Sequence, residues 1–310
     1  MLTKALLLLY LWLPSLSFGI SPVLWSEAVE IGGIKQWITA KGTSDKNPIL
    51  LFLHGGPGNS VMSIADRFTK ELQNNFVVVM WDQRESGQTV KLNLVHPELS
   101  LELLEEDVVE VVNFLRRRFS QDKIYLAGHS WGAFLALTLA ISSPGLLEAC
   151  FAISPMVNQL ESERLTLHWM KEVAKGALNN EAIKELEMVK IPFENGSQLY
   201  YHRKWLAILQ GSRPPSKAMV LTWARRWLKV FNQASAVNFS DTAPSIQCPT
   251  FFFIGKNDYQ THFKITEDFY KTVKAEKKDL FWFTNSGHNL NLTEPKKLQE
   301  IIISLQKPRN

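Results

Sequence analysis

The sequence of 310 residues is poor in cysteine, with only Cys150 and Cys248. A single disulfide between two cysteines cannot be the main support of a fold of this size, which excludes a disulfide scaffold. Both lie in apolar, strand-like runs, so we expect two buried thiols, and a disulfide between them stays open if the chain is exported. C-x-x-C and H-E-x-x-H spacings are also missing, so the sequence predicts no metal and no cofactor.

Dense charge of one sign is missing as well. The 34 Lys and Arg residues against 30 Asp and Glu residues give a net charge of +4. The basic residues are scattered among acids, which argues against a nucleic-acid partner and leaves a small molecule or short peptide. The 45% hydrophobic and 21% charged composition is typical of a soluble globular protein.

Long apolar runs are lacking. A membrane-spanning helix takes about 20 apolar residues, and no run in the sequence is that long. The run at 5–13 follows Lys4, ends at Pro14 and is followed by small residues before Ile20. This pattern predicts a secretory signal peptide over 1–19, and therefore a secreted or periplasmic protein with no stable membrane span. The alternative is a leader that stays uncleaved and anchors the chain in a membrane.

Short, continuous apolar runs separated by helical patterns make up much of the remaining chain. Continuous apolarity predicts strands covered on both faces, and alternation with helices predicts a parallel sheet. The runs lie at 49–53, 76–81, 123–127, 149–153, 250–254 and 280–283. Residues 23–31 and 36–40, joined by Gly32 and Gly33, predict an antiparallel hairpin at one edge. We therefore expect an α/β fold with a mostly parallel, eight-stranded sheet and helices on both faces.

The alternation stops between residues 156 and 242. This region has helical patterns and four tryptophans, but no convincing strand. We interpret it as a helical cap inserted over the edge of the sheet. The core would then consist of residues 20–155 and 243–310, with the cap at 156–242 between its two parts.

One motif points to chemistry. Gly128-x-Ser130-x-Gly132 lies between the strand run at 123–127 and a helical run at 133–141. This is the context of a nucleophile elbow, a sharp turn that raises a serine hydroxyl above the sheet. The turn brings neighbouring backbone so close that only glycine fits on either side. The motif predicts Ser130 as a nucleophile.

A nucleophilic serine needs a histidine as base, and the histidine needs a carboxylate that orients it. On this scaffold the acid and then the histidine follow the serine along the chain. Asp258 follows the run at 250–254, and His288 follows the run at 280–283. We expect these two as acid and base, with His262 as the weaker alternative for the base.

Acyl transfer also needs donors for the developing oxyanion. The segment HGGPG at 54–58 follows the run at 49–53, where this scaffold supplies one backbone N–H, and Trp131 directly follows the nucleophile. We expect the backbone N–H groups of Gly56 and Trp131 to form the oxyanion hole.

Together these motifs resemble the prolyl iminopeptidase branch of the α/β-hydrolase family. The matching segments are HGGPG at 54–58, WDQRESGQT at 81–89, GHSWG at 128–132, GKND at 255–258 and SGH at 286–288. They extend over nearly all of the mature chain except the cap. The resemblance implies a serine hydrolase that works through an acyl-enzyme and releases an N-terminal residue, often proline, from short peptides. It also implies Ser130, Asp258 and His288 as the catalytic triad.

The chain departs from that family at two positions. Glu85 stands where the family usually has glycine, and Leu228 follows Trp227 where the family tends to carry a glutamate that binds the substrate's amine. Other acids of the cap are candidates for that role, although each is more typical of a helix surface: Glu161, Glu163, Glu172, Glu185 and Glu187. We expect Asp82 and Arg84 to brace the sheet end and the oxyanion loop through an internal ion pair, rather than to contact substrate.

Two other functions stay open. One is a carboxylesterase whose Trp- and Phe-rich cap takes an apolar acyl or alcohol group. The other is a non-catalytic binding protein on the same fold, against which the presence of every catalytic part argues. Epoxide hydrolase and dehalogenase chemistry is disfavoured, because those relatives attack with a carboxylate where this chain has Ser130.

Overall fold

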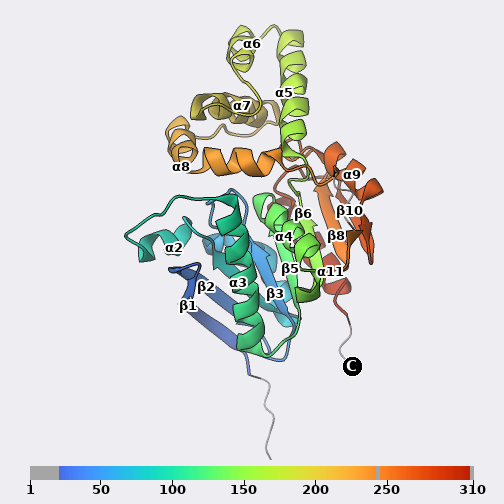
Figure 1. Cartoon of the computed structure of the whole chain (residues 1–310). Coiled ribbons are helices and arrows are strands. Elements are labelled where there is room, and N and C mark those ends of the chain that lie inside the picture. Colours follow the sequence, from blue (N-terminus) through green and yellow to red (C-terminus); the bar gives the residue numbers. More distant parts are fainter. Residues whose placement is uncertain (1–20, 242–244, 308–310) are drawn as a thin grey trace, which may run out of the picture.

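The structure, a computed structural model, describes residues 21–241 and 245–307. An eight-stranded sheet with the order β1-β2-β4-β3-β5-β6-β8-β10 forms its centre (Figure 1). The strands are β1 (Val23–Ile31), β2 (Ile34–Gly42), β3 (Ile49–Leu53), β4 (Val77–Asp82), β5 (Ile124–His129), β6 (Leu147–Ile153), β8 (Thr250–Gly255) and β10 (Lys278–Phe283). Strand β2 runs antiparallel to both of its neighbours, β1 and β4, and every other neighbouring pair is parallel. The predicted α/β fold with a mostly parallel sheet is confirmed.

The predicted edge hairpin is present. Strands β1 and β2 are joined at Gly32 and Gly33, whose φ angles of 55° and 73° suit a tight two-residue hairpin turn. Exposed or half-buried residues alternate with more buried ones along this pair, whereas β3, β4 and β5 are buried throughout. The difference follows from position, because central parallel strands are covered on both faces.

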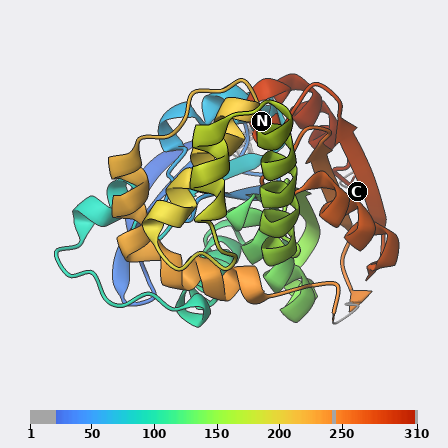
Figure 2. The ribbon, with the colours of Figure 1, turned by 90° about the horizontal axis from the view of Figure 1, so that it is seen from above.

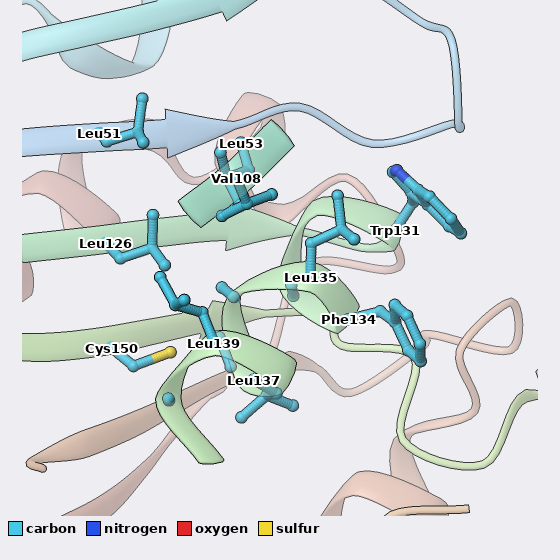
Figure 3. Packing of buried hydrophobic residues seen from close by; sticks show 14 of the residues in the cluster. Leu51, Leu53, Val108, Leu126, Trp131, Phe134, Leu135, Leu137, Leu139 and Cys150 are labelled. Atoms are coloured by element: carbon cyan, nitrogen blue, oxygen red, sulfur yellow. The ribbon is translucent and has the colours of Figure 1, made fainter. Parts of the chain in front are cut away.

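Helices cover both faces of the sheet. Alternate residues of a strand point to opposite faces, so Leu51 and Leu53 of β3 join one core with Val108 and Leu135 (Figure 3). Leu50 and Phe52 of the same strand join a second core on the other face. The helices that contribute to the first core include α3 (Leu101–Phe119), α4 (Trp131–Ser142) and α9 (Phe263–Thr272), and those that contribute to the second include α1 (Asp66–Thr69), α10 (Leu290–Thr293) and α11 (Pro295–Ser304).

The remaining small elements lie in the connections. They are α2 (Gly87–Leu92), the 3₁₀ helices η1 (Met62–Ile64), η2 (Glu71–Asn74) and η3 (Pro144–Leu146), and the short strands β7 (Ser245–Ile246) and β9 (Lys274–Ala275), which pair with each other. Cys150 and Cys248 are both buried and unpaired.

Four helices between β6 and β8 form the insert, which we call the cap. They are α5 (Gln159–Gly176), α6 (Asn180–Glu187), α7 (Gly196–Leu209) and α8 (Lys217–Ala236). Asn158, Asn179 and Asn195 cap the first three of these helices through their side-chain oxygens. The cap lies over one end of the sheet, with α8 nearest to it, and Figure 2 shows the molecule from the cap side (Figures 1 and 2). It has a small core of its own, built around Met170, Leu186 and Leu206.

The predicted leader at 1–19 lies outside the described residues. Within the described ranges, no helix has the length and apolarity needed to cross a membrane.

The expected ion pair between Asp82 and Arg84 is wrong. Arg84 instead reaches α3, where its Nε and Nη2 donate to the two carboxylate oxygens of Asp107, each at 2.8 Å. Nη2 also donates to the carbonyl oxygen of Gly32 in the β1–β2 hairpin at 2.8 Å. Asp82 ends β4 and accepts hydrogen bonds from Ser60 Oγ and, at 2.7 Å, from the backbone N–H of Gln88. The two side chains therefore bind to different parts of the fold, although the residues are close in sequence.

The buried Arg84–Asp107 pair predicts a large effect of breaking it. Both side chains are at most 1% exposed, so Asp107→Ala would leave a buried guanidinium without its counter-charge. We expect the free energy of unfolding to fall by about 3–5 kcal/mol, measured by urea denaturation at pH 7. The control is Lys271→Ala, which removes an exposed ion pair with Asp268 and should change stability little. Equal losses in the two variants would contradict this account.

Candidate active site

Ser130 stands at a strained turn between β5 and α4. Its φ and ψ angles are 56° and −116°, a conformation that side chains other than glycine rarely adopt. A Cβ atom on Gly128 would lie 2.1 Å from the carbonyl oxygen of Gly132, and one on Gly132 would lie 2.2 Å from the carbonyl oxygen of Leu53. Both glycines are therefore required by close backbone approach, as the elbow motif predicts.

The two residues predicted as acid and base lie beside each other. Asp258 follows β8 and His288 follows β10, and Nδ1 of His288 is 3.0 Å from Oδ2 and 3.2 Å from Oδ1 of Asp258. His288 and Ser130 both line one cavity below the cap. His262, the weaker candidate for the base, does not line that cavity.

Asp258 is held as an ionised acceptor. The hydroxyl of Thr261 donates to Oδ2 at 2.9 Å, and the backbone N–H groups of Gln260 and Thr261 donate to Oδ1 at 2.9 and 3.0 Å. Burial alone would raise the pKa of Asp258, but the His288 ring and these hydrogen bonds outweigh it, so the pKa lies below its ordinary value. Sequence reasoning missed Thr261, although its place three residues after the acid on a turn was a usable signal.

The loop that carries His288 is fixed by two donors to its carbonyl. Nε2 of His129 and Oγ of Ser154 donate to the carbonyl oxygen of His288 at 2.9 and 3.0 Å. The rings of His129 and His288 also pack with their centroids 4.9 Å apart. His129 lies in the GHSWG motif directly before the serine, so the same motif also orients the predicted base.

The two predicted oxyanion donors lie in the loop after β3 and at the start of α4. Gly56 has a φ of 124°, where a side chain would be strained. In the described part of the chain, the backbone N–H groups of Gly56 and Trp131 donate to no other group. Two free donors at this place are what an oxyanion hole needs.

Gln83, which sequence reasoning did not single out, connects the two sides of that hole. Its Nε2 donates to the carbonyl oxygen of His54 at 2.9 Å, and its Oε1 accepts from the indole N–H of Trp131 at 3.1 Å. The side chain is buried, so both bonds are shielded from water. The available signal was a polar residue directly after the buried strand β4, within the WDQR segment.

The cavity beside Ser130 has a volume of about 1030 Å³. Its core side includes Gly56, Asn59, Ser130 and His288, and its cap side is largely apolar: Trp169, Leu199, Leu206, Val220, Trp223 and Phe231. A concave, mostly apolar cavity with a few converging polar groups is typical of a binding site for a small molecule.

The charged side chains on the cavity wall are cationic. Arg203 and Arg213 line it, while no Asp or Glu among the described residues does. Of the five cap acids considered for amine binding, Glu163 binds two residues of the cavity wall, but it is buried and accepts from Arg203 Nη1 and Gln159 Nε2, each at 2.7 Å. Burial would raise the pKa of Glu163, but attraction to Arg203 and these hydrogen bonds lower it overall.

The other four acids do not line the cavity either. Glu161, Glu172 and Glu185 pair with Arg164, Lys175 and Lys204, and Glu187 is exposed. Within the described ranges, no cluster of His, Cys, Asp and Glu has the arrangement to hold a metal ion.

Two buried histidines predict acid sensitivity of the fold. Burial lowers the pKa of His129 and of His202 from 6.5 to about 4, so each stays neutral in the folded protein and becomes protonated more readily in the unfolded chain. Their contribution to stability is therefore complete above about pH 6.5 and is lost as the pH falls towards 4. We expect the free energy of unfolding to drop across this window by up to about 3 kcal/mol per histidine, measured by urea denaturation at a series of pH values. A His202→Gln variant should lose less stability on acidification, and a flat profile in the parent protein would contradict the assignment.

Comparisons with known proteins identify the family of the chain. Residues 44–296 match the family described as serine aminopeptidase, S33. The protein named probable aminopeptidase YbaC, from Bacillus subtilis (strain 168), is 30% identical over 292 residues, which cover 86% of this chain and 91% of that protein. A proline iminopeptidase from Heyndrickxia coagulans is 21% identical over 266 residues, which cover 82% of this chain and 88% of that protein.

A solved structure shows the same fold. The proline iminopeptidase-related protein from Thermus thermophilus aligns with a TM-score of 0.60 and 21% identity, over 91% of this chain and 96% of that one. The sheet, the helical insert and the match over most of the chain all indicate the same family. The chain therefore belongs to the serine aminopeptidase S33 family, and it is a serine hydrolase with the α/β-hydrolase fold.

Proposed function

We propose that this chain is an aminopeptidase of the prolyl iminopeptidase type, with Ser130, Asp258 and His288 as its catalytic triad. The observation that carries the proposal is the hydrogen bond of 3.0 Å between Nδ1 of His288 and the ionised Asp258, at a cavity that Ser130 also lines. Because Nδ1 donates to Asp258, Nε2 is the ring nitrogen left without a proton, and it can accept the proton of the serine hydroxyl.

The proposed reaction has two halves. Ser130 Oγ attacks the scissile carbonyl carbon while His288 takes its proton, and the resulting oxyanion accepts hydrogen bonds from the backbone N–H groups of Gly56 and Trp131. The intermediate then collapses, the C–N bond breaks, and His288 gives the proton to the leaving amine. Water repeats the sequence on the acyl-enzyme and frees the acyl group and Ser130.

The names of the relatives and the shape of the cavity support a peptide substrate. The relatives reported above are named as aminopeptidases or iminopeptidases. The cap covers the cavity, so a short peptide should enter it more easily than a long or folded chain. We also propose that residues 1–19 direct export, on the composition of that segment alone.

Gln159 is the acceptor that we propose for the substrate's amino group. Its Nε2 donates to Glu163 and, at 2.8 Å, to the carbonyl oxygen of Gln260. Both partners only accept, which fixes the orientation of the amide, and the remaining Oε1 is buried without a partner among the described residues. Leaving a buried acceptor unpaired costs about 1–3 kcal/mol, which a donor on a substrate would recover. Gln159 also contributes to the cavity wall.

A second candidate, a carboxylesterase with an apolar acyl or alcohol pocket, is favoured by the charges of the cavity. Arg203 and Arg213 line it, and none of the described carboxylates does. A substrate ammonium would therefore lack the charge-assisted hydrogen bond that a carboxylate gives. An uncharged ester would lose nothing by this absence.

The nucleophile assignment predicts the effect of one substitution. Ser130→Ala should lower kcat/KM by about 10⁴–10⁶-fold, because the covalent route is removed, while the thermal unfolding transition stays in place. Ser216→Ala, at a serine on the wall of the same cavity, should keep activity near that of the parent. Ordinary turnover by the Ser130→Ala protein would show that another group is the nucleophile.

A substrate panel separates the candidate functions. We expect proline and alanine 4-nitroanilides with free amines to be hydrolysed with higher kcat/KM than their N-acetylated forms and than 4-nitrophenyl butyrate. The reverse order, with the ester hydrolysed and the free-amine anilides inert, would establish the carboxylesterase. Inertness toward every substrate, together with no labelling by an aryl phosphonate, would leave the non-catalytic binding protein.

A further inference from the structure

Helix α8 of the cap is hydrogen-bonded to the loop that carries Gly56. The indole Nε1 of Trp223 donates to the carbonyl oxygen of Pro57 at 2.8 Å. Pro57 directly follows Gly56, so this bond holds the Pro57–Gly58 peptide group, two peptide groups after the one that carries the proposed oxyanion donor. Trp223 is half-buried on the cavity wall, and its ring packs edge-on against Phe231 with centroids 5.7 Å apart.

A second tryptophan, one turn further along α8, contacts the next residue of the loop. Trp227 is buried against Gly58, where an added Cβ would lie 2.5 Å from the indole nitrogen. Residues four apart on a helix share a face, so Trp223 and Trp227 act on Pro57 and Gly58 from the same side. The indole of Trp227 therefore leaves no room for a side chain at Gly58, the last glycine of HGGPG.

A third contact fixes the position of α8. Arg226 Nη2 donates to Oε1 of Glu85 at 2.8 Å and to the carbonyl oxygen of Pro97 at 2.6 Å. Glu85 has a φ of 60°, which costs a residue other than glycine about 1 kcal/mol or more. It stands at the position where the resembling family usually has glycine. A carboxylate at this place lets the core hold the cap helix by an ion pair.

The loop is also held from the core side. Gln83 donates to the carbonyl oxygen of His54 at the start of the loop, and Trp223 donates to that of Pro57 near its end. Gly56 lies between these two anchors. An oxyanion donor acts only within about 2.7–3.1 Å of the oxygen it stabilises, so a small rotation of this segment would weaken it.

We infer that Trp223 is a positioning residue for the oxyanion hole, which holds the N–H of Gly56 in place through the carbonyl of Pro57 while α8 is docked. The inference rests on the proposed function, because it needs Gly56 as an oxyanion donor. It makes the cap part of the catalytic apparatus as well as a wall of the substrate cavity.

The test is Trp223→Phe, which keeps an aromatic ring against Phe231 and removes the N–H. We expect kcat on the best substrate of the panel to fall about 10-fold, less than the loss of a direct oxyanion donor, with little change in KM. The rate of labelling by an aryl phosphonate should fall by a similar factor, because its adduct places a phosphoryl oxygen in the same hole.

The matched control is Trp205→Phe. Trp205 of α7 is a buried cap tryptophan, and its Nε1, like that of Trp223, donates one hydrogen bond, to Glu185 at 2.7 Å. Unlike Trp223, it does not line the cavity. This variant should keep the parent kcat and labelling rate. If cap tryptophans only stabilise the cap, kcat and the labelling rate should fall equally in the two variants.

Two results would overturn the inference: a Trp223→Phe protein with the parent kcat or with only a raised KM, or an equal loss of kcat in Trp205→Phe. Both presuppose a parent protein that hydrolyses a substrate and reacts with the phosphonate. A parent inert to both would instead remove the proposed function on which the inference rests.

Discussion

The close approach of backbone at the turn around Ser130 is the constraint on which the rest of the site depends. With a φ of 56° at Ser130, β5 passes into α4 within one residue, and the backbone at Gly128 and Gly132 comes too close to its neighbours for a side chain. The strain is sustained because α4 is packed into the main core and β5 is buried on both sides. Weaker packing around α4 and β5 would let the turn relax and move the hydroxyl of Ser130 away from the cavity.

Around this turn, buried hydrogen bonds hold separate loops in register. Thr261 fixes Asp258, His129 fixes the backbone of His288, and Gln83 joins the segment after β3 to Trp131. The bonds of His129 and Gln83 join segments that belong to different strands, so the sheet sets the coarse geometry and the polar side chains refine it. The cap adds its own bond through Trp223, which links the substrate cavity to the proposed oxyanion hole.

The sheet, the hairpin and the approach of Asp258 to His288 could be predicted because each depends on local patterns: apolar runs, a Gly-Gly turn, and polar residues just past strand ends. Arg84 could not be assigned to Asp107, because Asp107 lies 23 residues away on α3 and the pairing depends on where that helix packs. Gln83 and Trp223 were missed for the same reason, since their partners lie far away along the chain. The amine-binding group could not be predicted, because the sequence does not show which acids of the cap are already paired. Glu163, one of the candidates, is bound by Arg203 and Gln159.

The central claim is that one strained serine carries the acyl group. Trapping the reaction of the parent protein with its best substrate by acid quench, followed by peptide mapping with mass spectrometry, tests it most directly. The account predicts a single added acyl mass on the peptide that contains Ser130. Turnover with the acyl mass on another residue, or with no covalent species under conditions where it should accumulate, would contradict it.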